Sequence, residues 1–294
     1  MTKKKRAVIV DSTANIGEEL FNHPQVYQAN LTTQFGEDDT YQDTWHEDKI
    51  KEFYDKMRDS KELPTSSQPS PMAYIELFDK MMEHRVEEVF ILTISDKISG
   101  TFKTAQSIAK EYEDRLTIHV IDSQTSSYGL KNMVIHLLKW MDQTKATDDI
   151  LRDTDELIKR TIVIAAVPDL TNLKKGGRIS HIKGMIAGVL KLKPILKVHE
   201  GYIQPVENVR GFKRTLTNLD RHLIDYVKEM GEDSDYKIAV VHSNDPDNAS
   251  KKAEDIKTAL KLTDDRVVVD DLTIVIATQV GEGVVAYIYL PQLP

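Results

Sequence analysis

The chain of 294 residues contains no cysteine, which excludes disulfide bonds, thiolate nucleophiles and zinc sites with cysteine ligands. It also lacks a Walker A loop, a G-x-S-x-G turn, an H-E-x-x-H helix and a paired glycine-rich dinucleotide turn. Its nine histidines include no pair spaced i, i+4, so we expect no metal site and no cofactor. Together these absences argue against the familiar hydrolases, kinases and dehydrogenases.

Long apolar runs are missing as well. The run at residues 7–10, behind the basic start at residues 3–6, is too short for a signal peptide or a membrane span, so we expect a cytoplasmic protein. The net charge of -8 argues against a nucleic-acid partner, because such proteins neutralise phosphates with Lys and Arg. The length is sufficient for two ordinary domains.

In the first half, short runs rich in Val and Ile alternate with longer amphipathic stretches. This alternation predicts a Rossmann-like α/β domain over residues 1–155, with a parallel sheet whose ligands gather beyond the carboxyl ends of the strands. The expected strands cover residues 7–10, 88–94 and 116–121, and the expected helices cover residues 45–60, 71–84, 100–113 and 127–143.

The second half mixes hairpin and helix signals. Glu200-Gly201 between two apolar runs predicts a hairpin, so we expect an α+β domain with a mixed sheet over residues 156–294. The expected strands cover residues 161–167, 194–198, 202–206, 237–242, 266–269 and 284–290, and the expected helices cover residues 212–230 and 246–260.

Hydroxyl-rich turns follow the expected strands. Ser70 and Pro71 form an ordinary helix start, but residues 64–71 carry more hydroxyls than a cap needs, so both a cap and a ligand site remain open. Ser99 and Gly100 open a helix, where backbone N–H groups attract a carboxylate or a phosphate; a simple cap is the alternative. Asp11 closes the first strand, and we expect it to organise the turn by hydrogen bonding rather than to act as a base.

Two basic turns and one glycine-containing segment occur in the second half. The turns, at residues 173–180 and 207–214, are either solvated or bind an anion or an acidic partner. Residues 278–283 interrupt an apolar run, and their glycines mark a bend that is either a plain turn or a close approach to a ligand. The small apolar residues of 184–190 are typical of core, or leave room for an alkyl chain.

In this order along the chain, these segments resemble the DegV family, the fatty-acid-binding carrier subunit of a bacterial fatty acid kinase. Six segments carry the resemblance: Val8-Ile9-Val10-Asp11-Ser12-Thr13-Ala14, Thr65-Ser66-Ser67-Gln68-Pro69-Ser70, Ser95 with Ser99-Gly100-Thr101, Lys174-Lys175-Gly176-Gly177-Arg178-Ile179-Ser180, Val209-Arg210-Gly211 with Lys213, and Val280-Gly281 with Gly283.

The resemblance implies a protein that is not an enzyme and that buries a fatty acid such as palmitate, stearate or oleate between its two domains. The residues expected near the carboxylate are Ser66, Ser99, Thr65, Gly100 and Gln279. The resemblance also implies that a separate kinase subunit converts the bound acid to an acyl-phosphate for phospholipid metabolism. It places Arg178 and Arg210 toward that kinase or its phosphates.

The sequence departs from the family pattern at three positions. Ser66 stands where threonine is usual and keeps the hydroxyl donor. Gln279 stands where histidine is common. Glutamine donates hydrogen bonds but neither carries a charge nor shuttles a proton, so the change should impair phosphoryl transfer to the carboxylate more than it impairs fatty acid binding. Glu282 replaces a common proline and would repel an anionic headgroup unless it points to solvent.

Two other functions remain open. The same strand-end residues fit a phosphotransferase or hydrolase acting on a small anion, and the Gln279 departure favours a lipid-responsive regulator without a kinase partner. The tail of a long-chain acid supplies about 0.8 kcal/mol per buried methylene, so in the carrier hypothesis the headgroup contacts serve mainly for orientation.

Overall fold

The computed structural model describes residues 4–37, 39–179, 192–231 and 234–294. Its first sheet is wholly parallel, with the strand order β2-β1-β6-β7. Helices cover both faces of this sheet, which is why β1 and β6 are apolar on both sides. The strands are β1 (Arg6–Asp11), β2 (Val26–Ala29), β6 (Glu88–Thr93) and β7 (Thr117–Asp122), and the helices are α1 (Gly17–Phe21), α3 (Pro71–Glu83), α4 (Thr101–Ala109), α5 (Tyr128–Asp142) and α6 (Thr147–Arg160).

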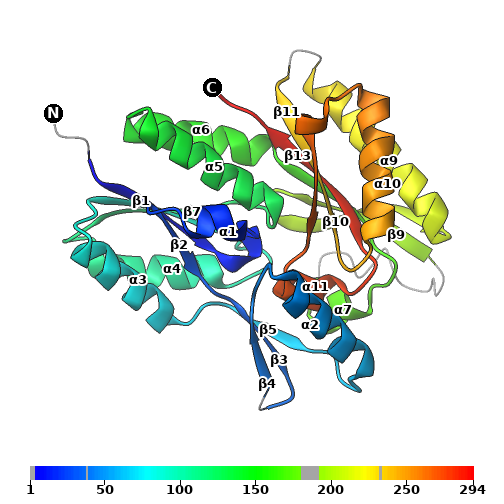
Figure 1. Cartoon of the computed structure of the whole chain (residues 1–294), viewed down its shortest axis with the longest axis horizontal. Coiled ribbons are helices and arrows are strands. Elements are labelled where there is room, and N and C mark those ends of the chain that lie inside the picture. The colour runs from blue at the N-terminus through cyan, green and yellow to red at the C-terminus, as the bar shows by residue number, and fades with distance from the viewer. Residues whose placement is uncertain (1–3, 38, 180–191, 232–233) are drawn as a thin grey trace.

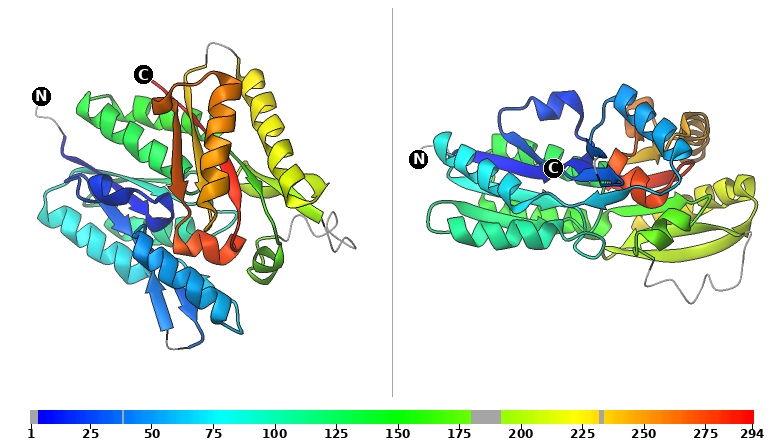
Figure 2. Two further views of the ribbon diagram at one scale, coloured as in Figure 1. Left: turned by 45° about the vertical axis from the view of Figure 1, so that its right-hand side comes forward. Right: turned by 90° about the horizontal axis from the view of Figure 1, so that it is seen from below.

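The second sheet is mixed, with the order β10-β9-β8-β13-β11-β12, and β11 with β12 is its parallel pair. One face is covered by α9 and α10, which lie side by side in Figures 1 and 2. The strands are β8 (Ile162–Ala166), β9 (Leu192–His199), β10 (Tyr202–Arg210), β11 (Tyr236–His242), β12 (Val267–Asp271) and β13 (Val285–Pro291), and the helices are α9 (Phe212–Met230) and α10 (Pro246–Leu260).

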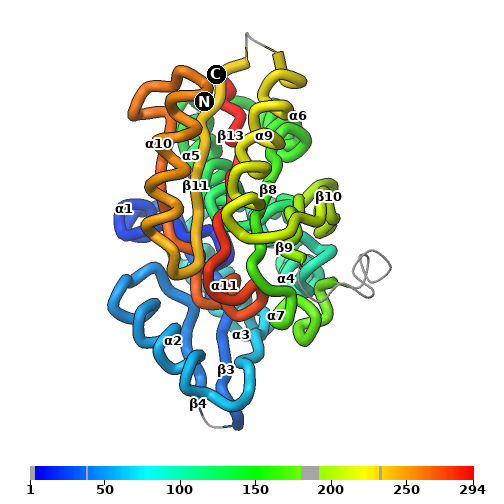
Figure 3. Tube along the Cα trace, turned by 90° about the vertical axis from the view of Figure 1, so that its right-hand side faces the viewer, coloured from blue at the N-terminus to red at the C-terminus, as the bar shows by residue number. Residues whose placement is uncertain are grey.

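A small antiparallel sheet projects from the first half of the chain toward the second. Its strands are β3 (Thr32–Phe35), β4 (Asp39–Gln42) and β5 (Thr65–Ser67), in the order β4-β3-β5, with α2 (Glu47–Asp59) beside it. It packs against α11 (Ile274–Val280), which in turn contacts α7 (Thr171–Lys175), as Figure 3 shows. This packing joins residues that are more than 200 positions apart in the sequence.

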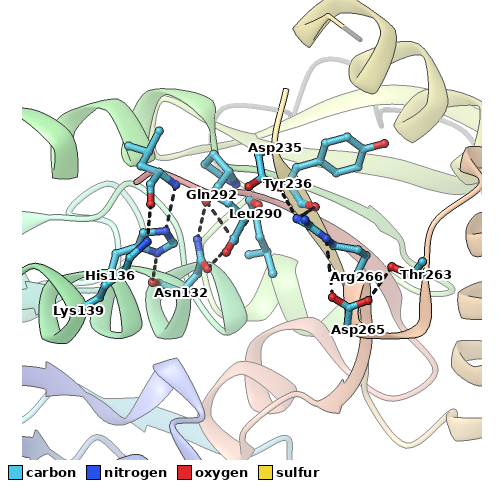
Figure 4. A network of polar contacts seen from close by, with 12 residues as sticks. Asn132, His136, Lys139, Asp235, Tyr236, Thr263, Asp265, Arg266, Leu290 and Gln292 are labelled. Carbon is cyan, nitrogen blue, oxygen red and sulfur yellow. Dashed lines mark hydrogen bonds and ion pairs between the residues drawn. The ribbon is translucent and has the colours of Figure 1, made fainter. Parts of the chain in front are cut away.

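The end of the chain is fastened to α5 by a chain of hydrogen bonds, drawn in Figure 4. Asn132 donates from Nδ2 to the carbonyl oxygen of Pro291 at 3.1 Å, and Leu293 N donates to Nε2 of His136 at 3.2 Å. His136 Nδ1 lies 2.8 Å from the carbonyl oxygen of Asn132, so the ring is held as one neutral tautomer. Burial accordingly lowers the pKa of His136. These bonds attach the second sheet to a helix that packs on the first.

The fold class expected from the sequence, an α/β protein with a parallel first sheet and a mixed second sheet, is confirmed. Several boundaries differ: residues 207–210, expected in a turn, extend β10, and residues 274–280 form α11 within what looked like an apolar run with a bend. Neither the small sheet nor the helix α6 was predicted from the sequence, although α6 has acidic residues in its first turn, basic residues in its last turn and one buried face, which is a helix pattern. The expected domain boundary near residue 155 falls inside α6 and stays a prediction. Residues 180 and 184–190 lie outside the described part of the chain.

Candidate functional site

A cavity of about 370 Å³ lies between the carboxyl edge of the first sheet and the face of the second sheet that is turned away from α9 and α10. Its volume falls at the lower end of the range for small-molecule sites. Much of its wall consists of apolar side chains from three neighbouring strands or the residues just beyond them: Val163, Ala165, Val167, Val241, Ala286 and Ile288. Cross-strand pairing of Ala286 with Ala165 sets two small side chains opposite each other, which leaves the space open.

Alternation along β8 explains why this space is not filled. On the side facing α9, a close-packed core contains Ile162, Ile164 and Ala166. Val163 and Ala165 point to the cavity instead, and they remain partly exposed although β8 is an interior strand. An apolar wall of this kind favours an alkyl chain over a polar metabolite.

One end of the cavity is polar. Ser66 on β5 and Gln279 on α11 meet there, with Gln279 Nε2 donating to Ser66 Oγ at 2.8 Å. Because Ser66 Oγ accepts this bond, its own proton remains available to an acceptor in the cavity. The carbonyl oxygen of the Gln279 amide is buried without a hydrogen-bond partner among the described residues.

Ser99 and Gly100 reach the same end from the loop between β6 and α4. Gly100 is the N-cap residue of α4, and the Ser99 hydroxyl lies 2.8 Å from Thr101 Oγ1. A Cβ atom at residue 100 would overlap Oε1 of Gln68, so the Gln68 side chain packs directly on Gly100. The Ser99 hydroxyl also accepts from Thr101 N, the first N–H group of α4, at 3.3 Å, and Ser99 and Gly100 themselves line the polar end of the cavity.

Asp11 holds the loop that carries Ser99. Its Oδ2 accepts from Ile94 N at 2.5 Å, and its Oδ1 accepts from Thr13 N at 3.0 Å. Burial raises the pKa of Asp11 to about 6, although these hydrogen bonds oppose the rise. The expectation that Asp11 organises the turn by hydrogen bonding is thus confirmed.

A second buried carboxylate, Asp43, positions the helix that carries Gln279. Its Oδ1 accepts from Val275 N in the first turn of α11 at 3.0 Å, and its Oδ2 accepts from Ser12 Oγ at 2.9 Å. Burial raises the pKa of Asp43 to about 6 as well. Asp43 therefore caps, from the first half of the chain, a helix of the second half.

Arg178 brings positive charge to the polar end. Arg178 lines the cavity, and its Nε donates at 3.2 Å to the carbonyl oxygen of Ile98, the residue before Ser99. Its Nη1 donates to the carbonyl oxygen of Gly176. Both partners are neutral, and no carboxylate pairs with Arg178 within the described residues, so its charge is available to an anion at this end.

The cavity thus combines an apolar wall with a polar end rich in hydrogen-bond donors. Comparison with known proteins shows the family. The DegV family model, whose description reads uncharacterised protein, DegV family, matches residues 5–292. The chain belongs to the DegV family. A curated relative, a DegV domain-containing protein of Halalkalibacterium halodurans, is 32% identical over 281 residues, which cover 95% of this chain and 96% of the relative.

Two solved DegV structures share the fold over nearly the whole chain. A fatty acid binding DegV family protein from Streptococcus agalactiae is 31% identical and covers 99% of this chain and 100% of its own, with a TM-score of 0.87. DegV of Bacillus subtilis, described as a fatty acid binding protein, is 27% identical with a TM-score of 0.84, covering 98% of this chain and 100% of its own.

The structure brings most of the expected DegV site residues together. Ser66, Ser99, Gly100, Gln279 and Arg178 all line the cavity, whereas Thr65 is exposed on β5 and does not reach it. Arg210 lies exposed at the end of β10. Glu282 does not line the cavity either, because its Oε1 accepts from Nη1 of Arg58 at 2.7 Å. It therefore does not oppose an anionic headgroup.

Other lining residues carried too weak a signal to be expected. Gln68 lies in a recognised motif, but its packing on Gly100 depends on the meeting of β5 and α4. Ser126 and Ser127 line the cavity from the turn before α5, a hydroxyl-rich strand end like the one that indicated Ser99. Ala165 and Ala286 are small residues in apolar strands, and only the tertiary packing shows that they border a space.

Two general properties of the chain bear on the site. Among the described residues, no group of three or more histidine, aspartate and glutamate side chains is arranged to hold a metal ion. In the same part of the chain, no helix is both long and apolar enough to cross a bilayer.

Proposed function

We propose that this protein binds a long-chain fatty acid, such as palmitate, stearate or oleate, in the cavity. The observation that carries the proposal is one cavity with an apolar wall and a single end where Ser66, Ser99 and Arg178 gather. The alkyl tail lies along β8 and contributes about 0.8 kcal/mol per buried methylene, which makes it the main source of affinity. The fatty-acid-binding relatives from Streptococcus agalactiae and Bacillus subtilis support this proposal.

The carboxylate lies at the polar end in this proposal. Burying it without partners would be very costly, and the Ser66 and Ser99 hydroxyls, the N–H group of Gly100 and the Arg178 guanidinium are all donors. Gln279 orients Ser66 by donating to its oxygen, so the Ser66 proton points to the ligand. Gln279 also substitutes in part for Ser66 when that hydroxyl is removed, because its own N–H group becomes free.

We further propose that the protein presents the bound acid to a separate fatty acid kinase, which forms the acyl-phosphate. The exposed Arg210 at the end of β10 is the residue we assign to that contact. Arg178, which lines the cavity, reaches the carboxylate rather than a distant protein surface. That the chain itself catalyses no reaction stays a prediction.

The headgroup site is tested by the double variant Ser66→Ala with Ser99→Ala, compared with Ser107→Ala with Ser250→Ala, which removes two exposed hydroxyls elsewhere. Each charge-assisted hydrogen bond contributes on the order of 1.5–3 kcal/mol, and Gln279 replaces Ser66 only in part, so palmitate affinity should fall at least about tenfold in the double variant. Fluorescence competition with palmitate measures the affinity after removal of lipid. An unchanged affinity in the double variant would contradict the assigned headgroup site.

A further inference from the structure

Two carboxyl groups are buried beside the segments that carry the proposed headgroup site, the loop before α4 and the helix α11. Asp11 is 1% exposed and Asp43 is 4% exposed, and neither forms an ion pair within the described part of the chain. Both accept hydrogen bonds from N–H and hydroxyl donors instead. A buried carboxylate without a cation takes up a proton readily when another negative charge approaches it.

The two carboxyl groups are linked through one serine. Ser12, the residue after Asp11, donates from Oγ to Asp43 Oδ2 at 2.9 Å, and the same oxygen accepts from Leu31 N at 3.0 Å. Burial raises the pKa of Asp43 to about 6, and the charge of Asp11 adds to this rise. A charge on one carboxyl therefore disfavours a charge on the other, and the Asp11–Asp43 pair responds together to its surroundings.

Both carboxyl groups lie close to the wall of the cavity. Asp43 Oδ1 accepts from Val275 N at 3.0 Å, and Val275 lines the cavity. Gln279 N lies four residues farther along α11, so at a rise of about 1.5 Å per residue it is within about 9 Å of Asp43 Oδ1. Asp11 Oδ2 accepts from Ile94 N at 2.5 Å, and Ile94 lines the cavity as well.

An anionic headgroup at the polar end acts on this pair through the protein interior. Two unit charges about 12 Å apart, at an effective dielectric constant of about 20, change each other's ionisation by about tenfold. A headgroup beside Gln279 lies at a distance of this order from Asp43. Burial raises the pKa of both Asp11 and Asp43 to about 6, so a further tenfold change brings their titration close to pH 7.

The carboxyl groups of β12 also lie near the start of α11, but they have cationic partners. Asp270 Oδ2 lies 3.4 Å from Nζ of Lys131, and Asp271 Oδ1 lies 3.2 Å from Nδ1 of His242. A cation beside a carboxylate favours its charged form. These two aspartates are therefore less suited than the Asp11–Asp43 pair to take up a proton.

The remaining titratable groups near the pair keep one protonation state at neutral pH. Burial, with a smaller contribution from the charge of Asp11, raises the pKa of Tyr74 well above its ordinary value, so Tyr74 stays neutral. Arg178, at the polar end of the cavity, stays protonated because a guanidinium does not lose its proton in proteins. Neither group exchanges a proton when a ligand binds.

We propose that binding of an anionic headgroup in the cavity is coupled to proton uptake by the Asp11–Asp43 pair, which makes fatty acid affinity depend on pH. The inference rests on the proposed fatty acid site and adds the regulation of that site. By linkage, protonation of the pair favours the bound anion as much as the anion favours protonation. Affinity should therefore rise as the pH falls toward 6, because protonation removes a repulsive charge.

The test is isothermal titration calorimetry of the delipidated full chain with palmitate, in pairs of buffers that differ in ionisation enthalpy, which counts the protons taken up. Methyl palmitate is the uncharged comparison with the same tail. Asp43→Asn and Asp11→Asn each remove one titrating group and keep the shape of the side chain. Asp270→Asn is the matched control, because it makes the same change at a carboxyl that has a cationic partner.

The natural chain should take up about half a proton per palmitate at pH 6.5 and almost none at pH 8.5. Its palmitate affinity should rise about fivefold from pH 8.5 to pH 6. Methyl palmitate should bind without proton uptake. Asp43→Asn and Asp11→Asn should each at least halve the uptake and flatten the pH dependence, whereas Asp270→Asn should leave both as they are.

Equal proton uptake in the natural chain and in both pair variants would overturn the inference, because the proton would then reside on the palmitate carboxyl or elsewhere. Loss of the uptake in Asp270→Asn alone would overturn it too. The proton count of the natural chain needs no variant, so it decides even if a variant folds poorly. Palmitate binding without proton uptake overturns the inference and leaves the proposed function in place, whereas absence of palmitate binding overturns both.

Discussion

Replacing Ala165 by leucine should raise the stability of the empty protein and lower its affinity for palmitate. Ala165 borders the cavity from the middle of β8, so the three added carbons enter a space that is otherwise free. Ala166, the next residue, points to the opposite face and is fully buried in the core under α9. Ala166→Leu is therefore the matched control, with the same chemical change on the same strand.

The magnitudes follow from the two environments. Three displaced tail carbons at about 0.8 kcal/mol each correspond to about 2.4 kcal/mol, or roughly a fiftyfold loss of palmitate affinity. Filling the cavity should stabilise the empty Ala165→Leu variant by about 1 kcal/mol, which is a rise in Tm of roughly 2 °C. In Ala166→Leu, overpacking should instead cost about 1–3 kcal/mol and lower the Tm.

The assay combines calorimetric unfolding of delipidated protein with a palmitate competition titration. The opposite signs of the two Tm changes distinguish a cavity from a close-packed core. The reasoning is refuted if Ala165→Leu lowers the Tm as much as Ala166→Leu does, or if its palmitate affinity is unchanged.

Three further outcomes are expected. Burial raises the pKa of Asp43 to about 6, so the folded state favours the neutral form of this carboxyl. The neutral form therefore stabilises the folded protein fully below about pH 4, and this stabilisation is lost as the pH rises through 6. The free energy of unfolding of Asp43→Asn, relative to that of the natural chain, should therefore rise by up to about 3 kcal/mol between pH 4 and pH 8, as measured by urea unfolding. A difference in unfolding free energy that does not change with pH would count against this. Gln279→Glu places a second carboxylate beside the proposed headgroup position. Palmitate affinity should therefore fall at least about tenfold at pH 8 and recover as the pH is lowered to 5. Equal weakening at both pH values would argue against the headgroup position. Arg210→Glu should reduce acyl-phosphate formation with the cognate kinase while palmitate affinity is retained. The control Lys228→Glu, on the exposed side of α9, should leave acyl-phosphate formation unchanged. Loss of palmitate binding in Arg210→Glu would argue against a role of Arg210 in the kinase contact.

The parallel first sheet was predictable because β1 and β6 are apolar on both faces, a pattern that local sequence carries. The helix α11 was not, because five of its seven residues are apolar and it is bounded by Thr273 and Gly281, which also suit a strand and a bend. Its helical form depends on Asp43, a cap supplied by a residue 232 positions away. No local reading of the sequence includes that contact.

The residues proposed to hold the headgroup were predictable as hydroxyl-rich segments, but the apolar wall of the cavity was not. Ser66 and Ser99 lie in turns whose composition indicates a binding site. Ala165 and Ala166 are identical neighbours in the sequence, and only the packing of α9 on one face of β8 makes one of them core and the other a cavity wall. Whether a small residue leaves a space is a property of the tertiary structure.

A crystal structure of the delipidated protein with added palmitate tests the central claim most directly. We expect the carboxylate within about 3 Å of the Ser66 and Ser99 hydroxyls, with the tail running along β8 past Ala165. A palmitate bound elsewhere, or with its carboxylate among the apolar strand residues, would contradict the account.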